Sequence, residues 1–140
     1  MVIGVGTDLV EIHRIKRACE RDSFVAYTFT EEERRQAGES VSRLAGDFAV
    51  KEAVSKSLGT GFRGFGPKDI EVLRDDLGKP YVKLYGEADR LAARQGIEEI
   101  FVSISNTGDH ALAFAVAQGR ESEGRMQDAV SADGKRGSGY

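Results

Sequence analysis

Strand-like and helix-like patterns of hydrophobic residues follow one another along the chain as far as Gly119. Residues 2–7 form a short apolar run rich in β-branched side chains, which predicts a strand. Its period of two puts Gly4, Gly6 and Asp8 on one face. Glycine in a strand often marks the close approach of a ligand or of another backbone. Further strands are predicted at 70–73, 81–85, 100–105 and 110–117, the first two pairing as a hairpin across the turn at 75–80.

Helix signals occupy the segments between these strands. Thr30 followed by Glu33 is a capping box, so a helix is expected to begin there and to break near 38–40. The longest helical stretch is 42–58, with Gly59 as its stop. The remaining predicted segments are a turn and short helix within 9–17, a glycine-rich loop at 59–67 and an alanine-rich helix at 87–95.

The order of the main predicted elements, βααββαββ, indicates an α+β fold in which a mainly antiparallel sheet packs on the long central helix. Residues 1–119 are expected to form one domain, which suits a length of 140 residues. Residues 120–140 lose the hydrophobic pattern and are rich in Glu, Ser, Gly, Arg and Lys, so a disordered polar tail is expected there.

Charged residues fall on two different faces of the central helix. Advancing by about 100° per residue puts Glu52 and Lys56 in a stripe of small and apolar side chains. The same projection puts Asp47, Lys51 and Ser55 on a face expected to meet solvent, with Asp47 and Lys51 as a surface i,i+4 pair. Glu52 and Lys56 can also be read as an ordinary surface ion pair. Their alanine surroundings favour a compensating metal or phosphate, because burying two charges is costly without further partners.

Asp8, Glu52 and Lys56 together have the residue types that a site for Mg²⁺ and phosphate needs. Mg²⁺ is usually held by one or two carboxylates together with water and substrate phosphates, and a lysine neutralises charge on a phosphoryl group. Taken alone, Asp8 can equally be a turn or helix-cap aspartate.

Three other polar groups have both a binding and a structural interpretation. The segment Gly59-Thr60-Gly61 lets backbone amides approach a phosphate, or simply ends the helix. Ser105 and Asn106 bind phosphate or adenosine hydroxyls, or shape a hairpin turn. His110 is a candidate base, or a structural strand histidine.

Composition narrows the class of protein. The chain has 20 Lys and Arg against 23 Asp and Glu, a net charge of −3, which argues against general nucleic-acid binding. Arg14, Arg17 and Arg21 nevertheless form a local basic patch. The one cysteine, Cys19, allows no intrachain disulfide and is expected to be incidental. With no signal-peptide pattern and no apolar run long enough for a membrane span, we expect a cytoplasmic protein that does not bind membranes.

Two long motifs, in order, resemble one enzyme family. Residues 3–12 (IGVGTDLVEI), with Arg14, look like the opening of holo-[acyl-carrier-protein] synthase, the small type of 4′-phosphopantetheinyl transferase. Residues 48–53 (FAVKEA), with Lys56 and the segment 58–61 (LGTG), resemble the second signature of that family. Three shorter segments follow the same family pattern, namely Phe29-Thr30 with Glu33, then Gly78-Lys79-Pro80, then Ser103-Ile104-Ser105. The resemblance therefore covers about residues 1–118.

The resemblance implies a Mg²⁺-dependent transfer of phosphopantetheine from coenzyme A to a serine of an apo acyl carrier protein, with release of 3′,5′-ADP. It implies that Asp8 and Glu52 bind Mg²⁺ and act in catalysis with Lys56, which stabilises the transferring or leaving phosphate. It also implies homotrimers with sites between subunits. The resemblance assigns Gly59, Thr60 and Gly61 to the coenzyme A phosphates, and we expect Lys51, Ser105, Asn106 and His110 to bind coenzyme A as well. It assigns Arg14 to the acidic carrier protein, and we expect Arg17 and Arg21 to extend that patch.

The chain departs from the family pattern at two positions, since the family commonly has His where Asn106 stands and an aromatic residue where His110 stands. Two other functions therefore stay open. One is a catalytically weak relative that only binds carrier proteins. The other is an unrelated Mg²⁺-dependent phosphohydrolase, which would need only the carboxylates and the lysine.

Overall fold

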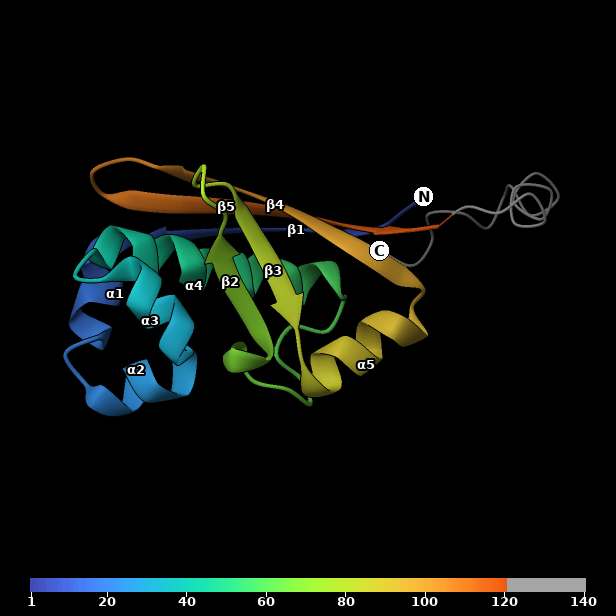
Figure 1. Ribbon diagram of the computed structural model, residues 1–140, viewed down its shortest axis with the longest axis horizontal. Coiled ribbons are helices and arrows are strands. Elements are labelled where there is room, and N and C mark those ends of the chain that lie inside the picture. Colours follow the sequence, from blue (N-terminus) through green and yellow to red (C-terminus); the bar gives the residue numbers. More distant parts are fainter. Residues whose placement is uncertain (121–140) are drawn as a thin grey trace, which may run out of the picture.

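The computed structural model describes residues 1–120 and contains two antiparallel sheets arranged around one long helix (Figure 1). The α+β fold with a long central helix is confirmed, but the strands divide into two sheets. The elements in chain order are β1 (Val2–Glu11), α1 (Ile12–Ala18), α2 (Asp22–Thr28), α3 (Glu31–Ala37), α4 (Val41–Ser57), a 3₁₀ turn (Pro67–Asp69), β2 (Ile70–Arg74), β3 (Pro80–Leu84), α5 (Gly86–Arg94), β4 (Ile97–Asn106) and β5 (His110–Gly119). The predicted tail 120–140 lies, except for Arg120, outside the described residues.

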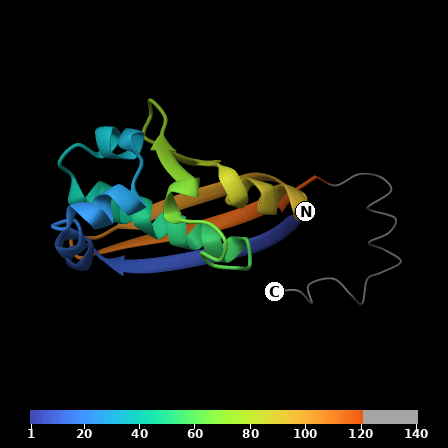
Figure 2. The ribbon, with the colours of Figure 1, turned by 90° about the horizontal axis from the view of Figure 1, so that it is seen from below.

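The larger sheet has the strand order β1-β5-β4, and one of its faces packs against α4 (Figure 2). The central strand β5 directs Ala111, Ala113, Ala115 and Ala117 inward, all of them buried. Small side chains let the sheet and the helix approach closely. The core then extends to the smaller β2–β3 sheet through buried residues such as Val54 and Val72.

Close contact between β1 and α4 explains the glycines of the first strand. A Cβ on Gly4 would lie 2.0 Å from the Ser57 carbonyl oxygen, and one on Gly6 would lie 1.9 Å from the Ala53 carbonyl oxygen. The glycines therefore accommodate the backbone of α4 rather than a ligand. Asp8, next on the same face of the strand, is carried to the side of α4 as a result.

Most of the predicted helix boundaries are confirmed. The Thr30 hydroxyl accepts a hydrogen bond from the Glu33 amide while the Glu33 carboxylate accepts one from the Thr30 amide, which is the expected capping box. The break after Ala37 and the long helix α4 also agree with the prediction. The sequence pattern missed α2 and ended β1 too early, since that strand continues through Glu11 as the partner of β5.

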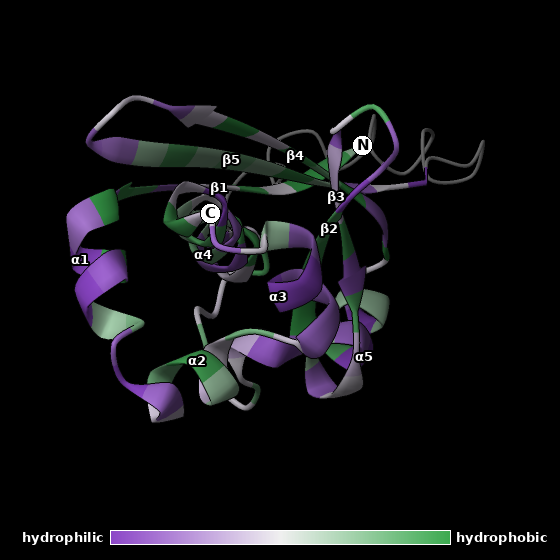
Figure 3. Cartoon of the chain, turned by 60° about the vertical axis from the view of Figure 1, so that its left-hand side comes forward, coloured by the Kyte–Doolittle hydropathy of each residue, from purple (hydrophilic) through white to green (hydrophobic). Residues whose placement is uncertain are grey.

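The short helices α1 to α3 cover the N-terminal end of α4 and carry many hydrophilic residues (Figure 3). Within residues 1–120, no helix is both long and apolar enough to cross a membrane.

Candidate active site

The side chains of Asp8, Glu52 and Lys56 converge where β1 crosses the C-terminal half of α4. The Lys56 ammonium donates to the Thr7 carbonyl oxygen at 3.0 Å and lies 3.5 Å from Asp8 Oδ1. Burial raises the pKa of Asp8, and the Lys56 charge opposes that effect. Burial, and next the charge of Asp8, raise the pKa of Glu52. Two carboxylates that disfavour each other's ionisation thus share one cationic side chain, which is itself half exposed.

One oxygen of Asp8 lacks a partner. Asp8 Oδ2 is buried and accepts no hydrogen bond from the described residues. Leaving a buried acceptor unpaired costs about 1–3 kcal/mol. A hard cation beside Asp8 and Glu52 would satisfy this oxygen and relieve the repulsion between the two carboxylates. Two carboxylates suit an ion such as Mg²⁺, which also takes water and phosphate oxygens. Among residues 1–120 there is no group of three or more His, Cys, Asp or Glu side chains that could hold a metal.

The glycine-rich loop begins directly after α4. Gly59 and Gly61 adopt φ values of 82° and 62°, which side-chain-bearing residues rarely adopt. The Gly59 amide donates to the Lys56 carbonyl oxygen, and the Gly61 amide donates to that of Ser55. Gly59, Thr60 and Gly61 therefore lie at the Lys56 end of the helix, close to the acidic pair.

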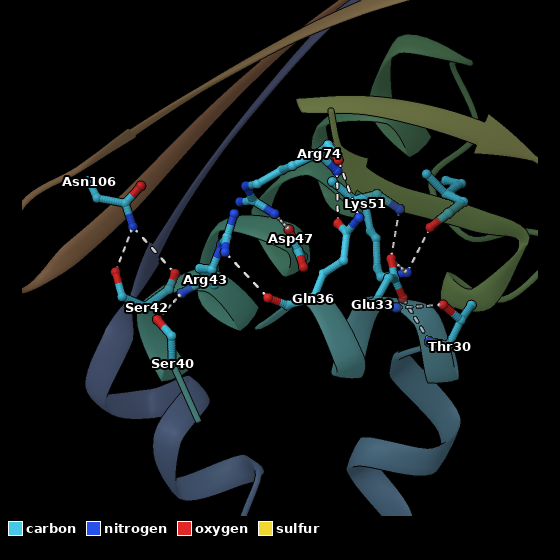
Figure 4. Close-up of polar contacts among 12 residues, drawn as sticks. Thr30, Glu33, Gln36, Ser40, Ser42, Arg43, Asp47, Lys51, Arg74 and Asn106 are labelled. Atoms are coloured by element: carbon cyan, nitrogen blue, oxygen red, sulfur yellow. Dashed lines mark hydrogen bonds and ion pairs between the residues drawn. The ribbon is translucent and has the colours of Figure 1, made fainter. Parts of the chain in front are cut away.

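Asn106 lies at the opposite end of α4. Its side-chain amide donates to Ser42 Oγ at 3.0 Å (Figure 4). The rise of an α-helix places Ser42 about 20 Å from Lys56. Ser105 is exposed on the other face of β4, paired with Leu112. Within one chain, the residues predicted to bind coenzyme A are thus not brought together.

Asn106 borders a small cavity of about 290 Å³. Two of its lining residues, Arg43 and Arg74, were missed by sequence reasoning. Arg74 also pairs with the buried Asp47 at 2.5 Å. Gly78 and Pro80 line the same cavity. The Gly78-Lys79-Pro80 turn is part of the family resemblance and was the available signal for this cavity.

The predicted solvent face of α4 is wrong. Asp47, Lys51 and Ser55 are all buried, and the Lys51 ammonium contacts the Glu33 carboxylate at 2.7 Å (Figure 4). The i,i+4 pair is also wrong, since Asp47 pairs with Arg74. The reason is that α3 and β2 cover this face and bring the compensating charges. Lys51 is therefore inaccessible to coenzyme A.

The basic patch Arg14, Arg17 and Arg21 is exposed beside α1. Arg14 also lines a cavity of about 450 Å³ whose walls include Phe24 and Phe48. His110 lines this same cavity, opposite Glu11 in the sheet, so it lies with the arginines and not with the glycine loop. Burial raises the pKa of the Cys19 thiol, so this cysteine is not activated.

The outer face of the larger sheet is apolar and exposed. It carries Val5, Leu9, Phe101, Leu112 and Phe114, whose exposed fractions range from 43% to 63%. The register brings them together, since Leu9 pairs with Leu112 and Val5 with Val116. So many large apolar side chains on one face are typical of an interaction surface.

Comparison with known proteins agrees with this geometry. The family model of the 4′-phosphopantetheinyl transferase superfamily matches residues 4–115. The chain is similar to the holo-[acyl-carrier-protein] synthase of Lachnoclostridium phytofermentans, with 48% identity over 118 residues that cover 84% of this chain and 97% of the relative.

Solved structures share the fold. The holo-[acyl-carrier-protein] synthase of Neisseria meningitidis superimposes with a TM-score of 0.77 at 38% identity, covering 84% of this chain and 99% of the other. The Helicobacter pylori synthase in complex with coenzyme A gives a TM-score of 0.74 at 28% identity, covering 81% and 99%. With matching motifs, architecture and a convergent acidic pair beside a lysine, the chain belongs to the 4′-phosphopantetheinyl transferase superfamily.

Proposed function

We propose that this chain transfers the 4′-phosphopantetheine arm of coenzyme A to a serine of an apo acyl carrier protein and releases 3′,5′-ADP. The observation that carries the proposal is the convergence of Asp8, Glu52 and Lys56, with Asp8 Oδ2 buried and unpartnered among the described residues. The unrelated phosphohydrolase does not agree with the family assignment.

Mg²⁺ fits Asp8 and Glu52 as its protein ligands. When bound, it would neutralise the pyrophosphate oxygens and orient them for displacement. In the reaction, the serine oxygen forms a bond to the phosphorus that carries pantetheine, and the bond from that phosphorus to the oxygen of 3′,5′-ADP breaks. Asp8 helps to remove the serine proton, and Lys56 stabilises the charge on the phosphoryl groups.

Coenzyme A is proposed to bind across two subunits. Gly59, Thr60 and Gly61 adjoin the catalytic residues and suit its pyrophosphate. Asn106 and Ser105 lie near the far end of α4, where Arg43 and Arg74 suit a phosphate at the nucleotide end. These groups are too far apart in one chain to form a single compact pocket, which supports a homotrimer with sites between subunits. The apolar outer face of the sheet supports the same assembly.

The acidic carrier protein is proposed to dock on Arg14, Arg17 and Arg21. The apolar cavity beside Arg14 suits an aliphatic side chain of that partner, with Phe24 and Phe48 as its walls. His110 joins this docking site in our proposal rather than the coenzyme A site. The cytoplasmic location stays a prediction.

The decisive experiment mixes the purified chain with Mg²⁺, coenzyme A and an apo acyl carrier protein, and weighs the carrier by mass spectrometry. We expect a mass gain of one phosphopantetheine that is lost in Glu52→Gln. The matched control is Glu39→Gln, since Glu39 is exposed and away from the acidic pair. Coenzyme A binding without transfer to any carrier would instead favour the relative that only binds carrier proteins. Transfer that persists in excess EDTA would contradict the Mg²⁺ proposal.

A further inference from the structure

Lys51 is a fully buried lysine whose ammonium is completely satisfied. It lies 2.7 Å from Glu33 Oε2 and donates to the carbonyl oxygens of Ile70 at 2.7 Å and Pro67 at 2.9 Å. An ammonium has three hydrogens, so each of them has one acceptor. The side chain has no exposed surface and therefore no capacity to bind a ligand.

Glu33 is equally satisfied by the protein. Its Oε1 accepts from the Thr30 amide at 2.8 Å, and its Oε2 accepts from the Val72 amide at 2.7 Å as well as from Lys51. The pair thereby joins α3, α4, the 3₁₀ turn and β2 (Figure 4). Burying two charges costs much of what their attraction returns, so apolar side chains of similar size would often stabilise a fold as well. The pair therefore calls for an explanation other than stability.

The contact with Pro67 suggests that explanation. The glycine-rich loop, residues 59–66, enters from the end of α4 and leaves at Pro67. Its entry is held by hydrogen bonds from Gly59 and Gly61 to α4. Its exit is held, from inside the protein, by the Lys51 ammonium on the Pro67 carbonyl oxygen. Lys51 directly precedes Glu52 on α4. This one helix therefore positions both Glu52, the proposed metal ligand, and the two ends of the loop.

We propose that Lys51 and Glu33 are positioning residues for the transfer reaction. The buried pair holds the exit of the glycine loop so that its backbone amides keep the spacing that fits the pyrophosphate of coenzyme A. This inference rests on the proposed function, since it assigns that loop to coenzyme A. Lys51 acts on the substrate only through the loop and does not touch it.

The test uses the double variant Glu33→Gln with Lys51→Met, which removes both charges of the pair together. We expect the variant to fold and its KM for coenzyme A to rise by about ten- to a hundredfold, since a displacement of about 1 Å remote from the chemistry can cost roughly 10²-fold. The KM for the carrier protein should change less than about twofold, because the arginines of α1 are not attached to the loop. Lys83→Met, an exposed lysine on β3, is the matched control and should leave both KM values unchanged.

Hydrogen exchange provides a second measurement. Amides of residues 59–66 should exchange faster in the double variant, and those of residues 111–117 at the wild-type rate. A folded variant with wild-type KM for coenzyme A and unchanged loop exchange would overturn the proposal, as would a loss of active protein with both KM values preserved. Should the double variant not fold, the KM for coenzyme A and the hydrogen exchange of residues 59–66 are measured in Lys51→Arg instead. If the wild-type chain transfers nothing, the proposed function fails. Hydrogen exchange of residues 59–66 in the double variant still tests whether Lys51 and Glu33 hold the loop.

Discussion

Replacing Gly6 with alanine tests the contact on which the whole site depends. The added Cβ would lie 1.9 Å from the Ala53 carbonyl oxygen and 2.9 Å from the Ser57 amide nitrogen. Cβ contacts under 3.0 Å essentially do not occur in proteins, so β1 and α4 must separate by about 1 Å. The clashing atoms belong to the backbone of a helix and cannot rotate away. The strain must therefore spread through the contact between the sheet and the helix.

The expected cost follows from this geometry. Overpacking a core costs about 1–3 kcal/mol and occasionally more, and a clash with backbone belongs at the upper end. We expect Gly6→Ala to lower the free energy of unfolding by about 3 kcal/mol or more. Because domains are stable by only about 5–15 kcal/mol, the variant should lose a large fraction of its stability. Asp8, two residues along the strand, should also be displaced from Glu52 and Lys56, and transfer should fall by roughly a hundredfold.

Urea denaturation followed by circular dichroism measures the effect. The matched control is Gly108→Ala, since a Cβ added at Gly108 would meet no atom within 4 Å and the backbone there has no positive φ. That substitution should shift the free energy of unfolding by less than about 1 kcal/mol. If Gly6→Ala were as stable as Gly108→Ala, the close contact between β1 and α4 would not exist in solution, and the argument for the position of Asp8 would fail.

Three further predictions concern other parts of the chain. Burial raises the pKa of Asp47 from 3.8 to about 6 against the opposing charge of Arg74, so the folded state holds this proton more tightly than the unfolded state. The free energy of unfolding should therefore decrease by roughly 2–3 kcal/mol as the pH rises from about 4 to 6. Urea titrations of Asp47→Asn should show no such decrease. The same pH dependence of stability in the variant and the wild type would refute this prediction. Phe114→Glu should dissociate the assembly in analytical ultracentrifugation, and a monomeric wild-type chain would contradict the interface. Arg17→Glu should raise the KM for the carrier protein but not for coenzyme A, with Arg34→Glu as the control; equal effects would argue against docking on α1.

Much of this protein could be predicted from sequence because the relevant signals are local. The capping box at Thr30, the extent of α4 and the hairpin of β2 and β3 each depend on residues within a few positions of one another. Asp8, Glu52 and Lys56 were also proposed from sequence as one site, and the structure brings these three side chains together. Their residue types and their motifs carry that information without knowledge of distant contacts.

The tertiary structure determines the features that depend on partners from elsewhere in the chain. Helical periodicity put Lys51 and Asp47 on a solvent face, whereas Glu33 and Arg74 arrive from α3 and β2 and allow both to be buried. The neighbour of the strand glycines proved to be the backbone of α4, because sequence does not say which element crosses a strand. Sequence also does not show that Asn106 lies far from the glycine loop, because that distance depends on how β4 packs against α4. Local pattern specifies which elements form, but burial, charge compensation and the distance between sites arise only when elements distant in sequence pack together.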